Sequence, residues 1–103
     1  MMDKKQYSLL GLMQRAGALI TGEELVVKAV QSNKAKLVVL AEDASANTEK
    51  KISDKCRYYN IPLYRLGSRD DLGAAVGKER RVVIAVTDTG FADAYQKNEK
   101  KRV

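Results

Sequence analysis

Three residues near the C-terminal end invite a catalytic interpretation. Asp88, Thr89 and Gly90 follow an apolar segment and form the Asp-Thr-Gly tripeptide of aspartic proteases. A chain of 103 residues also suits a protease that works as a dimer, in which two carboxylates share one proton. Such an enzyme is an all-β dimer with a glycine-rich flap, whereas this sequence shows helical stretches and no flap pattern. We therefore favour Asp88 or Thr87 as the N-cap of the last helix.

A pair of carboxylates suggests a second chemistry, the binding of Mg²⁺. Glu42 and Asp43 follow an apolar strand, at the carboxyl end where open α/β sheets often hold ligands. The chain has neither a Walker lysine motif nor a Gly-x-Gly-x-x-Gly pattern to hold a phosphate beside such a metal. Gly11, Gly17 and Gly22 are too far apart to form a phosphate loop. A solvated loop explains the pair better, so we predict no metal and no cofactor.

The residue counts exclude most familiar catalysis. The chain has no histidine, the usual general base near neutral pH and the commonest metal ligand. Ser-His-Asp and Cys-His mechanisms are therefore impossible within one chain. Cys56 is the one cysteine, and it shares the apolar stripe of its helix with Ile52 and Tyr59. We interpret it as a buried, inert thiol and expect no enzyme activity.

The same counts bear on the compartment. A single cysteine makes no intrachain disulfide, which favours a reducing environment. No apolar run approaches the roughly 20 residues of a membrane span, and residues 1–7 lack the apolar core of a signal peptide. We expect a cytoplasmic protein without a membrane partner.

The chain carries a net charge of +6, which favours a polyanionic partner. Residues 51–103 hold 12 basic and seven acidic side chains, whereas residues 1–50 hold seven and six. The tail from residue 97 onward accounts for four of the basic ones, and a tail can be solvated without binding anything. Charge alone therefore names no partner.

The start of a predicted helix near Gly22 is the most informative place in the sequence. Its free amides and positive dipole end suit an anion, and Lys28 follows one turn later. The alternative is local, because Thr21 and Glu24 fit a Thr-x-x-Glu capping box in which Glu24 only closes the helix end.

The charges around this helix are mixed. Lys34 and Lys36 flank the loop at its other end, while Glu23 and Glu24 near its start would repel phosphate. A carboxylate can still accept hydrogen bonds from base edges, so the mixture favours groove-edge readout over non-specific phosphate binding.

Two neighbouring tyrosines leave another alternative open. Helical geometry buries only one of Tyr58 and Tyr59. The exposed one could stack on a base, but we favour a role as core or surface filler.

Apolar periodicity supplies the elements that position these residues. Continuous apolar runs predict strands at 37–41, 63–66 and 82–86, the first of them central. Helical spacing or helix-end signals predict helices over 4–15, from about 22 to the stop at 32–33, between 45 and 60, from 68 to 77 and after 88. Strands that alternate with helices indicate an α/β protein, a three-layer αβα sandwich. We expect one domain over residues 1–96 and a basic C-terminal tail over 97–103.

Six segments, taken in order, resemble those of one known family: residues 15–19, 22–30, 34–38, 41–45, 60–64 and 72–77. The chain resembles the kink-turn RNA-binding ribosomal proteins, the L-seven-Ae and L-thirty-e family, and is most similar to its small bacterial members. The resemblance covers roughly residues 8 to 95. It implies a sandwich with a mixed sheet of about four strands that grips a kinked RNA helix.

In that family the start of the second helix enters the groove near tandem sheared G·A pairs, through a Gly-x-Asn-Glu-x-x-Lys pattern. The resemblance implies that Gly22 lets the backbone come close, that Glu24 takes the Asn place and that Lys28 takes the Lys place. Two positions depart from the pattern. Leu25 stands where the family has Glu, and Glu24 only accepts hydrogen bonds where Asn also donates, so the G·A readout is weakened or altered.

The family's second contact is the loop after its Leu-Gly-x-x-x-Gly segment, which cradles flipped-out nucleotides. Here that loop consists of Lys78, Glu79, Arg80 and Arg81. It is more basic than the apolar version of archaeal members, which indicates more phosphate contact and less base packing.

We therefore predict a non-enzymatic RNA-binding protein, ribosomal-protein-like, that recognises a kink-turn or similar internal loop in structured RNA, with ribosomal RNA as the expected target. No DNA partner is expected, and the chain should be a monomer. The alternative is a protein-interaction module on the same scaffold with a weakened or lost RNA site. The predicted RNA-binding residues are Gly22, Glu23, Glu24, Lys28, Lys34, Lys36, Lys78, Glu79, Arg80 and Arg81.

Overall fold

The computed structural model describes residues 3–100, over which five helices alternate with four strands. In chain order the elements are α1 (Asp3–Arg15), β1 (Leu19–Thr21), α2 (Glu23–Gln31), β2 (Leu37–Leu40), α3 (Ala46–Tyr58), β3 (Leu63–Arg65), α4 (Arg69–Ala75), β4 (Val83–Val86) and α5 (Thr89–Lys100).

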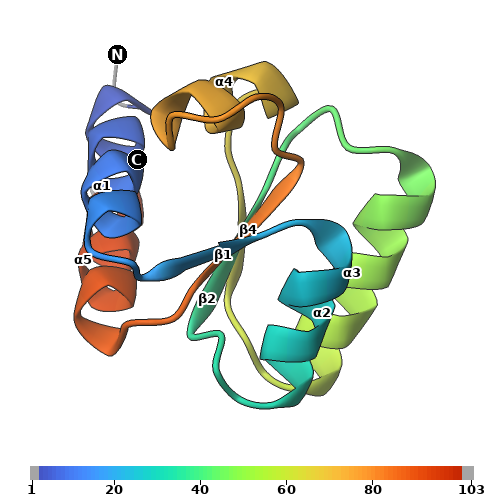
Figure 1. Ribbon diagram of the computed structural model, residues 1–103. Helices are drawn as coiled ribbons and strands as arrows, with labels where there is room; N and C mark the ends of the chain where they lie inside the picture. Colours follow the sequence, from blue (N-terminus) through green and yellow to red (C-terminus); the bar gives the residue numbers. More distant parts are fainter. Residues whose placement is uncertain (1–2, 101–103) are drawn as a thin grey trace.

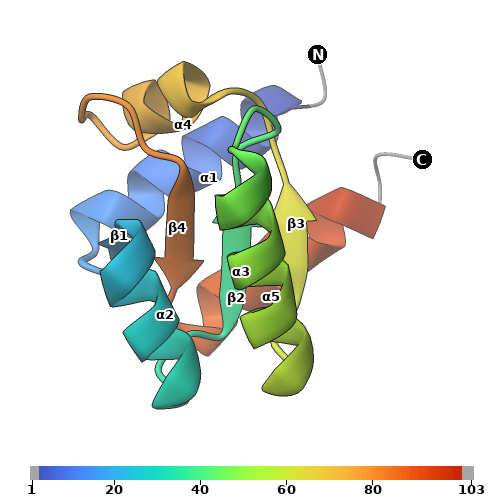
Figure 2. The same ribbon diagram turned by 90° about the vertical axis from the view of Figure 1, so that its right-hand side faces the viewer.

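The strands form one mixed sheet in the order β1-β4-β2-β3. β4 runs antiparallel to both β1 and β2, whereas β2 and β3 are parallel and are joined by the crossover helix α3. Figure 1 shows α1, α4 and α5 on one side of the sheet and α2 and α3 on the other. Figure 2 shows α2 and α3 in front of the sheet after the turn by 90°. The predicted three-layer sandwich is confirmed.

The central strands are buried on both faces, which explains their continuous apolar sequence. Leu37 and Val39 of β2 belong to the core under α1, α4 and α5, and Val38 and Leu40 belong to the core under α2 and α3. This alternation follows from the two-residue period of a strand. Burying such a side chain contributes roughly 1.5–3 kcal/mol to the stability of the fold, so the side chains of β2 stabilise the packing of both helical layers. The prediction of a central strand here is confirmed.

The edge strand β1 could not be recognised from its residues. A segment of three residues is too short to show alternation, and residues 19–20 look like a short apolar step between two helices. In the structure Leu19 pairs with Val86 and Thr21 with Ile84. This strand completes the set of four that the family resemblance implied.

The predicted capping box at Thr21 and Glu24 is wrong. Thr21 is the last residue of β1, and its Oγ1 accepts a hydrogen bond from Nε of Arg81 at 3.3 Å. The N-cap of α2 is Gly22, and no side chain caps this helix. Pairing with β4 holds Thr21 in extended backbone, so a tertiary contact overrides the local signal.

Two other helix starts agree with the sequence. Ser68 and Asp71 form a complete capping box at α4. At α5, Oδ2 of Asp88 accepts the backbone N–H of Phe91 at 2.9 Å. Asp88 is therefore a helix cap, and this role explains the protease-like tripeptide without any catalytic function.

The last helix runs further than expected. The sequence predicted a fraying tail from residue 97, but α5 continues to Lys100. The boundary expected between 96 and 97 therefore falls inside a helix, and residues 101–103 of the predicted tail lie outside the described residues.

The cap of α5 yields a stability prediction. Asp88→Ala should lower the free energy of unfolding by about 1 kcal/mol, whereas Asp88→Asn should keep most of it, because an amide oxygen can also accept the Phe91 N–H. Urea denaturation measures both. Asp93→Ala, at an exposed position within the same helix, is the control and should change stability by less than about 0.5 kcal/mol. Equal loss in Asp88→Asn and Asp88→Ala would show that Asp88 does not act as a cap.

Candidate nucleic-acid interface

Two segments that lie far apart in the sequence meet beside the end of β1. The backbone N–H of Gly22 donates to the carbonyl oxygen of Val83 at 3.3 Å, and the Arg81 side chain reaches Thr21. Between them is a hollow of about 400 Å³. It is lined by Thr21, Gly22, Glu23, Thr48, Arg80, Arg81, Val82 and Val83. The start of α2 and the loop before β4 thus form one surface.

Gly22 gives this surface an open backbone. Its φ of 99° and ψ of 139° lie in a region that residues with a Cβ rarely adopt, so the conformation itself calls for glycine. A Cβ built there would meet nothing within 4 Å, so a ligand can come close. Because no side chain caps α2, its first N–H groups and the positive end of its dipole remain free for an acceptor.

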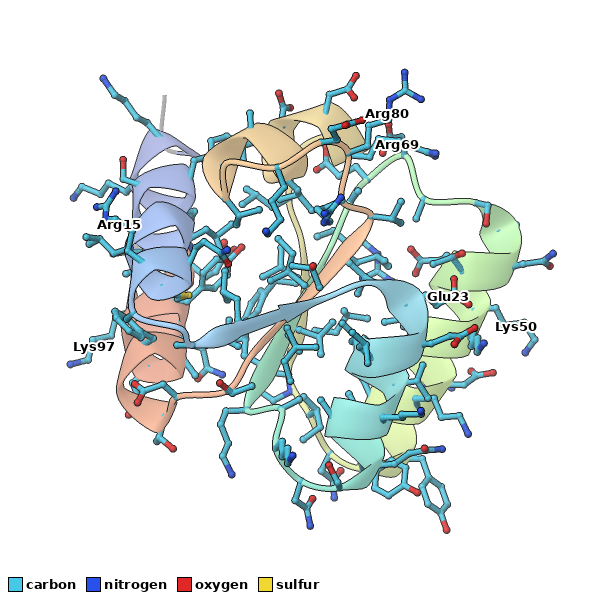
Figure 3. All side chains as sticks on the ribbon, in the orientation of Figure 1. Arg15, Glu23, Lys50, Arg69, Arg80 and Lys97 are labelled. Atoms are coloured by element: carbon cyan, nitrogen blue, oxygen red, sulfur yellow. The ribbon has the colours of Figure 1, made fainter. Side chains whose placement is uncertain are left out.

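The carboxylate of Glu23 is directed to α3, as Figure 3 shows. It accepts a hydrogen bond from Oγ1 of Thr48 at 2.8 Å and forms an ion pair with Nζ of Lys51 at 3.1 Å. The Thr48 hydrogen bond and then Lys51 lower the pKa of Glu23 below its usual value. Its negative charge is thus compensated within the protein, which reduces the repulsion of phosphate expected from the sequence.

The loop of residues 77–81 is held against α4 by a glycine. Gly73 is buried, and a Cβ there would lie 2.2 Å from the carbonyl oxygen of Glu79. The N–H of Lys78 donates to the Gly73 carbonyl at 2.9 Å, and Gly77 adopts a φ of 70° after the helix end. The Leu-Gly-x-x-x-Gly spacing therefore has a structural cause, since both glycines are needed to fold the loop back.

The two arginines of this loop have different tasks. The guanidinium of Arg81 donates to the carbonyl of Arg80 at 2.8 Å and to Thr21, so it ties the loop to β1. Arg80 forms an ion pair with Asp70 at 3.2 Å (Nε to Oδ1), and both side chains are more than 70% exposed. An exposed pair of this kind contributes little to stability, so Arg80 can exchange Asp70 for a phosphate.

Three lysines predicted for the site lie away from this hollow, one along α2 and two beyond its end. Lys28 and Lys34 line a separate hollow of about 270 Å³ together with Leu25, which is 57% exposed. Lys36 lies in the segment after α2, where its Nζ donates to the carbonyl of Asn33 at 3.0 Å. Since α2 is about 14 Å long, Lys34 and Lys36 lie at the opposite end from Gly22.

The predicted set of site residues therefore divides by position. Four of them line one hollow: Gly22, Glu23, Arg80 and Arg81. Three more are exposed on the same two segments: Glu24, Lys78 and Glu79. The lysines lie further away, Lys28 along α2 and Lys34 and Lys36 beyond its end.

Sequence reasoning missed two residues of α3 at this surface. Thr48 lines the hollow, and Lys51 forms an ion pair with Glu23. Both lie at least 25 residues from Glu23 in the sequence, and no local pattern connects them. The signal that could have placed them near Glu23 is the topology, since α2 and α3 cover the same face of the sheet.

The rival chemistries have structural explanations. Oδ1 of Asp43 accepts the backbone N–H of Arg69 at 2.9 Å, so this carboxylate stabilises the start of α4. Burial raises the pKa of the Cys56 thiol to about 11, which keeps it protonated and unreactive. Within residues 3–100 no group of three potential metal ligands occurs, and no helix is both long and apolar enough to span a membrane.

Comparison with known proteins places this geometry in context. A model of the "Ribosomal protein L7Ae/L30e/S12e/Gadd45 family" matches residues 4–95. The RNA-binding protein YlxQ of Bacillus subtilis (strain 168) is 54% identical over 87 residues, which cover 84% of this chain and 87% of that protein. YlxQ of Enterococcus faecium is 46% identical and covers 86% and 85% of the two chains. The large ribosomal subunit protein eL30 of Eremothecium gossypii is 33% identical, with 82% of each chain covered.

Two solved structures share the fold. A protein with unknown function from Bacillus halodurans C superposes with a TM-score of 0.88 at 50% identity, over 91% of this chain and 95% of that one. The Giardia lamblia 15.5kD RNA binding protein has a TM-score of 0.82 at 21% identity, over 97% and 86%. The second likeness concerns the fold alone.

The close packing at Gly73 yields a prediction about the loop. Gly73→Ala should lower the free energy of unfolding by about 1–3 kcal/mol, because the added methyl group would overlap the Glu79 carbonyl and force the loop away from α4. Urea denaturation measures the loss, and amide exchange of Lys78 reports its bond to Gly73. Ala74→Ser, at the exposed next position, is the matched control. Unchanged stability and Lys78 exchange in Gly73→Ala would contradict this packing.

Proposed function

Because the chain belongs to the ribosomal protein L7Ae/L30e/S12e/Gadd45 family, we propose that it binds structured RNA through the start of α2 and the loop of residues 77–81. Its relatives are RNA-binding and ribosomal proteins, so the chain is a ribosomal-protein-like RNA-binding protein of a non-enzymatic family. The resemblance to small bacterial members of this family is confirmed. We propose further that its target is a kink-turn or a similar internal loop.

The observation that carries the proposal is the meeting of the two segments at one hollow. The open backbone at Gly22 lies next to the basic loop that ends with Arg80 and Arg81. A surface that combines free amides with arginines suits a bent backbone of phosphates better than a regular duplex. Both groups are hydrogen-bond donors, and phosphate oxygens accept from them.

The charges at this surface support contact with both phosphates and bases. Glu23 is neutralised by Lys51, whereas Glu24 is exposed on the first turn of α2 and can accept from a base edge. Lys28 makes no ion pair within residues 3–100, so its charge is available one turn further along. Exposed Leu25 beside it adds an apolar contact where the family has Glu.

The second candidate is a protein-interaction module with a weakened RNA site. The observation that favours it is the pair of departures from the family pattern, because Leu25 removes a carboxylate and Glu24 lacks the hydrogen-bond donor of Asn. Both candidates use the same scaffold and differ in whether RNA binds selectively. A monomeric state, a cytoplasmic location and a preference for RNA over DNA stay predictions.

The test compares a kink-turn RNA with a straight duplex of equal length at physiological salt, by mobility shift. Binding should be roughly tenfold tighter or more for the kink-turn, because base-edge contacts at the α2 start require the opened groove. It should also fall steeply as salt rises, because several phosphates are neutralised. Equal affinity for the two RNAs would show that the protein binds RNA only through its overall positive charge. Absence of binding would favour the protein-interaction module.

Single substitutions locate the site in the same assay. Lys28→Ala and Arg80→Ala should each weaken kink-turn binding about tenfold, the effect of losing one hydrogen bond to a charged group. Both side chains are exposed, so stability should be preserved. Lys97→Ala makes the same charge change on α5, in the other helical layer (Figure 3), and should leave the affinity within about twofold. A loss in the control equal to the losses at the site would contradict the assignment.

A further inference from the structure

Another hollow lies along α3, and of its lining residues only Lys51 belongs to the surface described above. Its volume is about 570 Å³, larger than that of the hollow at Gly22. It is lined by Lys51, Asp54, Lys55, Tyr58 and Tyr59. An aromatic pair bordered by lysines is a combination that binds nucleic acid bases and their phosphates.

Tyr58 is the exposed member of an aromatic pair. Tyr58 is 79% exposed, whereas Tyr59 is partly buried and packs against the core under α2 and α3. The two ring centroids lie 4.8 Å apart with an interplanar angle of 76°. Tyr59 thus contacts Tyr58 edge to face, and much of the Tyr58 surface stays open to solvent. As expected, the two tyrosines differ: Tyr59 is partly buried, and the exposed ring of Tyr58 is suited to stacking.

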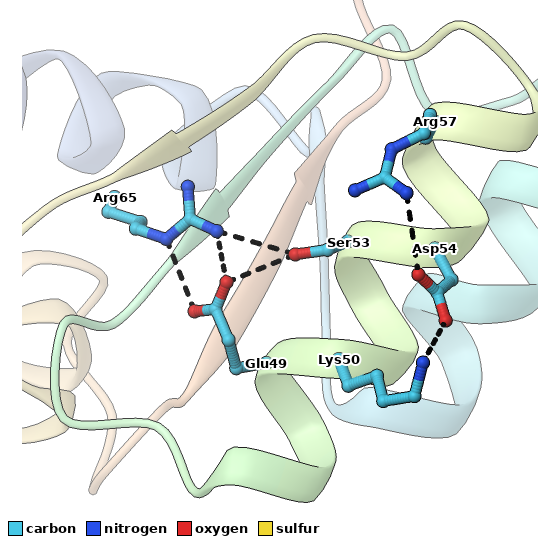
Figure 4. Close-up of polar contacts among 6 residues, drawn as sticks. All are labelled: Glu49, Lys50, Ser53, Asp54, Arg57 and Arg65. Carbon is cyan, nitrogen blue, oxygen red and sulfur yellow. Dashed lines mark hydrogen bonds and ion pairs between the residues drawn. The ribbon is translucent and has the colours of Figure 1, made fainter.

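The acidic groups of α3 are already paired, as Figure 4 shows. Glu49 accepts from Nε of Arg65 at 3.2 Å, and this contact lowers the pKa of the carboxyl. Asp54 is shared by Lys50 at 3.1 Å and Arg57 at 3.9 Å. The helix carries four basic and two acidic residues, so the surroundings of Tyr58 keep an excess of positive charge.

One lysine of this hollow also connects it to the proposed RNA surface. Lys51 lines the hollow and binds Glu23 at the start of α2, and Thr48 before it lines the hollow at Gly22. From Thr48 to Tyr58 the helix rises about 15 Å, roughly the length of four or five nucleotides along a strand. Lys55, between them, makes no ion pair within residues 3–100.

We propose that this face of α3 is a second RNA site, at which a base of an unpaired nucleotide stacks on Tyr58 while Lys51 and Lys55 contact the adjoining phosphates. The inference rests on the proposed function, because the strand would continue from RNA bound at the start of α2. A single strand is the ligand, since a duplex hides the faces of its bases except at its ends. The positive surroundings favour RNA over an apolar protein segment.

The experiment uses the kink-turn RNA with a five-nucleotide single-stranded extension placed on one end at a time. At least one extended RNA should bind about tenfold more tightly than the unextended RNA. Tyr58→Ala should abolish that gain without weakening the unextended RNA, and Tyr58→Phe should retain it, because a phenyl ring also stacks. Leu12→Ala removes another exposed hydrophobic side chain, 48% exposed on α1, and should leave the gain unchanged.

Each remaining outcome decides the matter. If no extension raises the affinity, or if Tyr58→Ala keeps the gain, the second site is refuted, and a protein partner becomes the better explanation of the exposed ring. If Tyr58→Ala weakens both RNAs equally, Tyr58 does not contact the extension. If the unextended RNA fails to bind, the proposed function is wrong. The free pentanucleotide then tests the α3 site alone, since quenching of tyrosine emission that requires Tyr58 supports it and no such quenching overturns it.

Discussion

The antiparallel pairing of β1 with β4 is the constraint on which the candidate site depends. It places the end of β1 beside the beginning of β4, with Thr21 opposite Ile84. The α2 start leaves from one strand and the 77–81 loop enters the other, so residues about 60 positions apart become neighbours. The pairing thus brings together two kinds of hydrogen-bond donor, the free amides at the start of α2 and the arginines of the loop.

The helical layer of α2 and α3 adds a further contact at the edge of the hollow. The hydrogen bond from Thr48 and the ion pair with Lys51 hold Glu23 against α3, so α2 and α3 are joined at the edge of the hollow. This contact compensates the negative charge of Glu23 at the start of α2. Figure 2 shows α2 and α3 side by side in front of the sheet, so the tyrosine-bearing helix α3 lies next to the helix that begins at Gly22.

The sequence predicted those features that neighbouring residues determine and missed those that depend on tertiary contacts. The buried run of β2 and the caps at Ser68 and Asp88 follow from neighbouring residues, and the structure contains all three. The edge strand β1 is too short for any pattern, and the capping box predicted at Thr21 is wrong because pairing with β4 overrides it. For the site, the resemblance pointed to both segments, but their meeting and the part played by Lys51 required the tertiary structure.

The central claim is that one continuous surface, built by the β1–β4 pairing, receives the RNA. Amide chemical shifts of the labelled protein, recorded as an unextended kink-turn RNA is added, test it most directly. The account predicts that the largest changes fall together on residues 22–28 and 77–81, with little change in α1 and α5. Shifts on only one of the two segments, or shifts centred on α1 and α5, would contradict it.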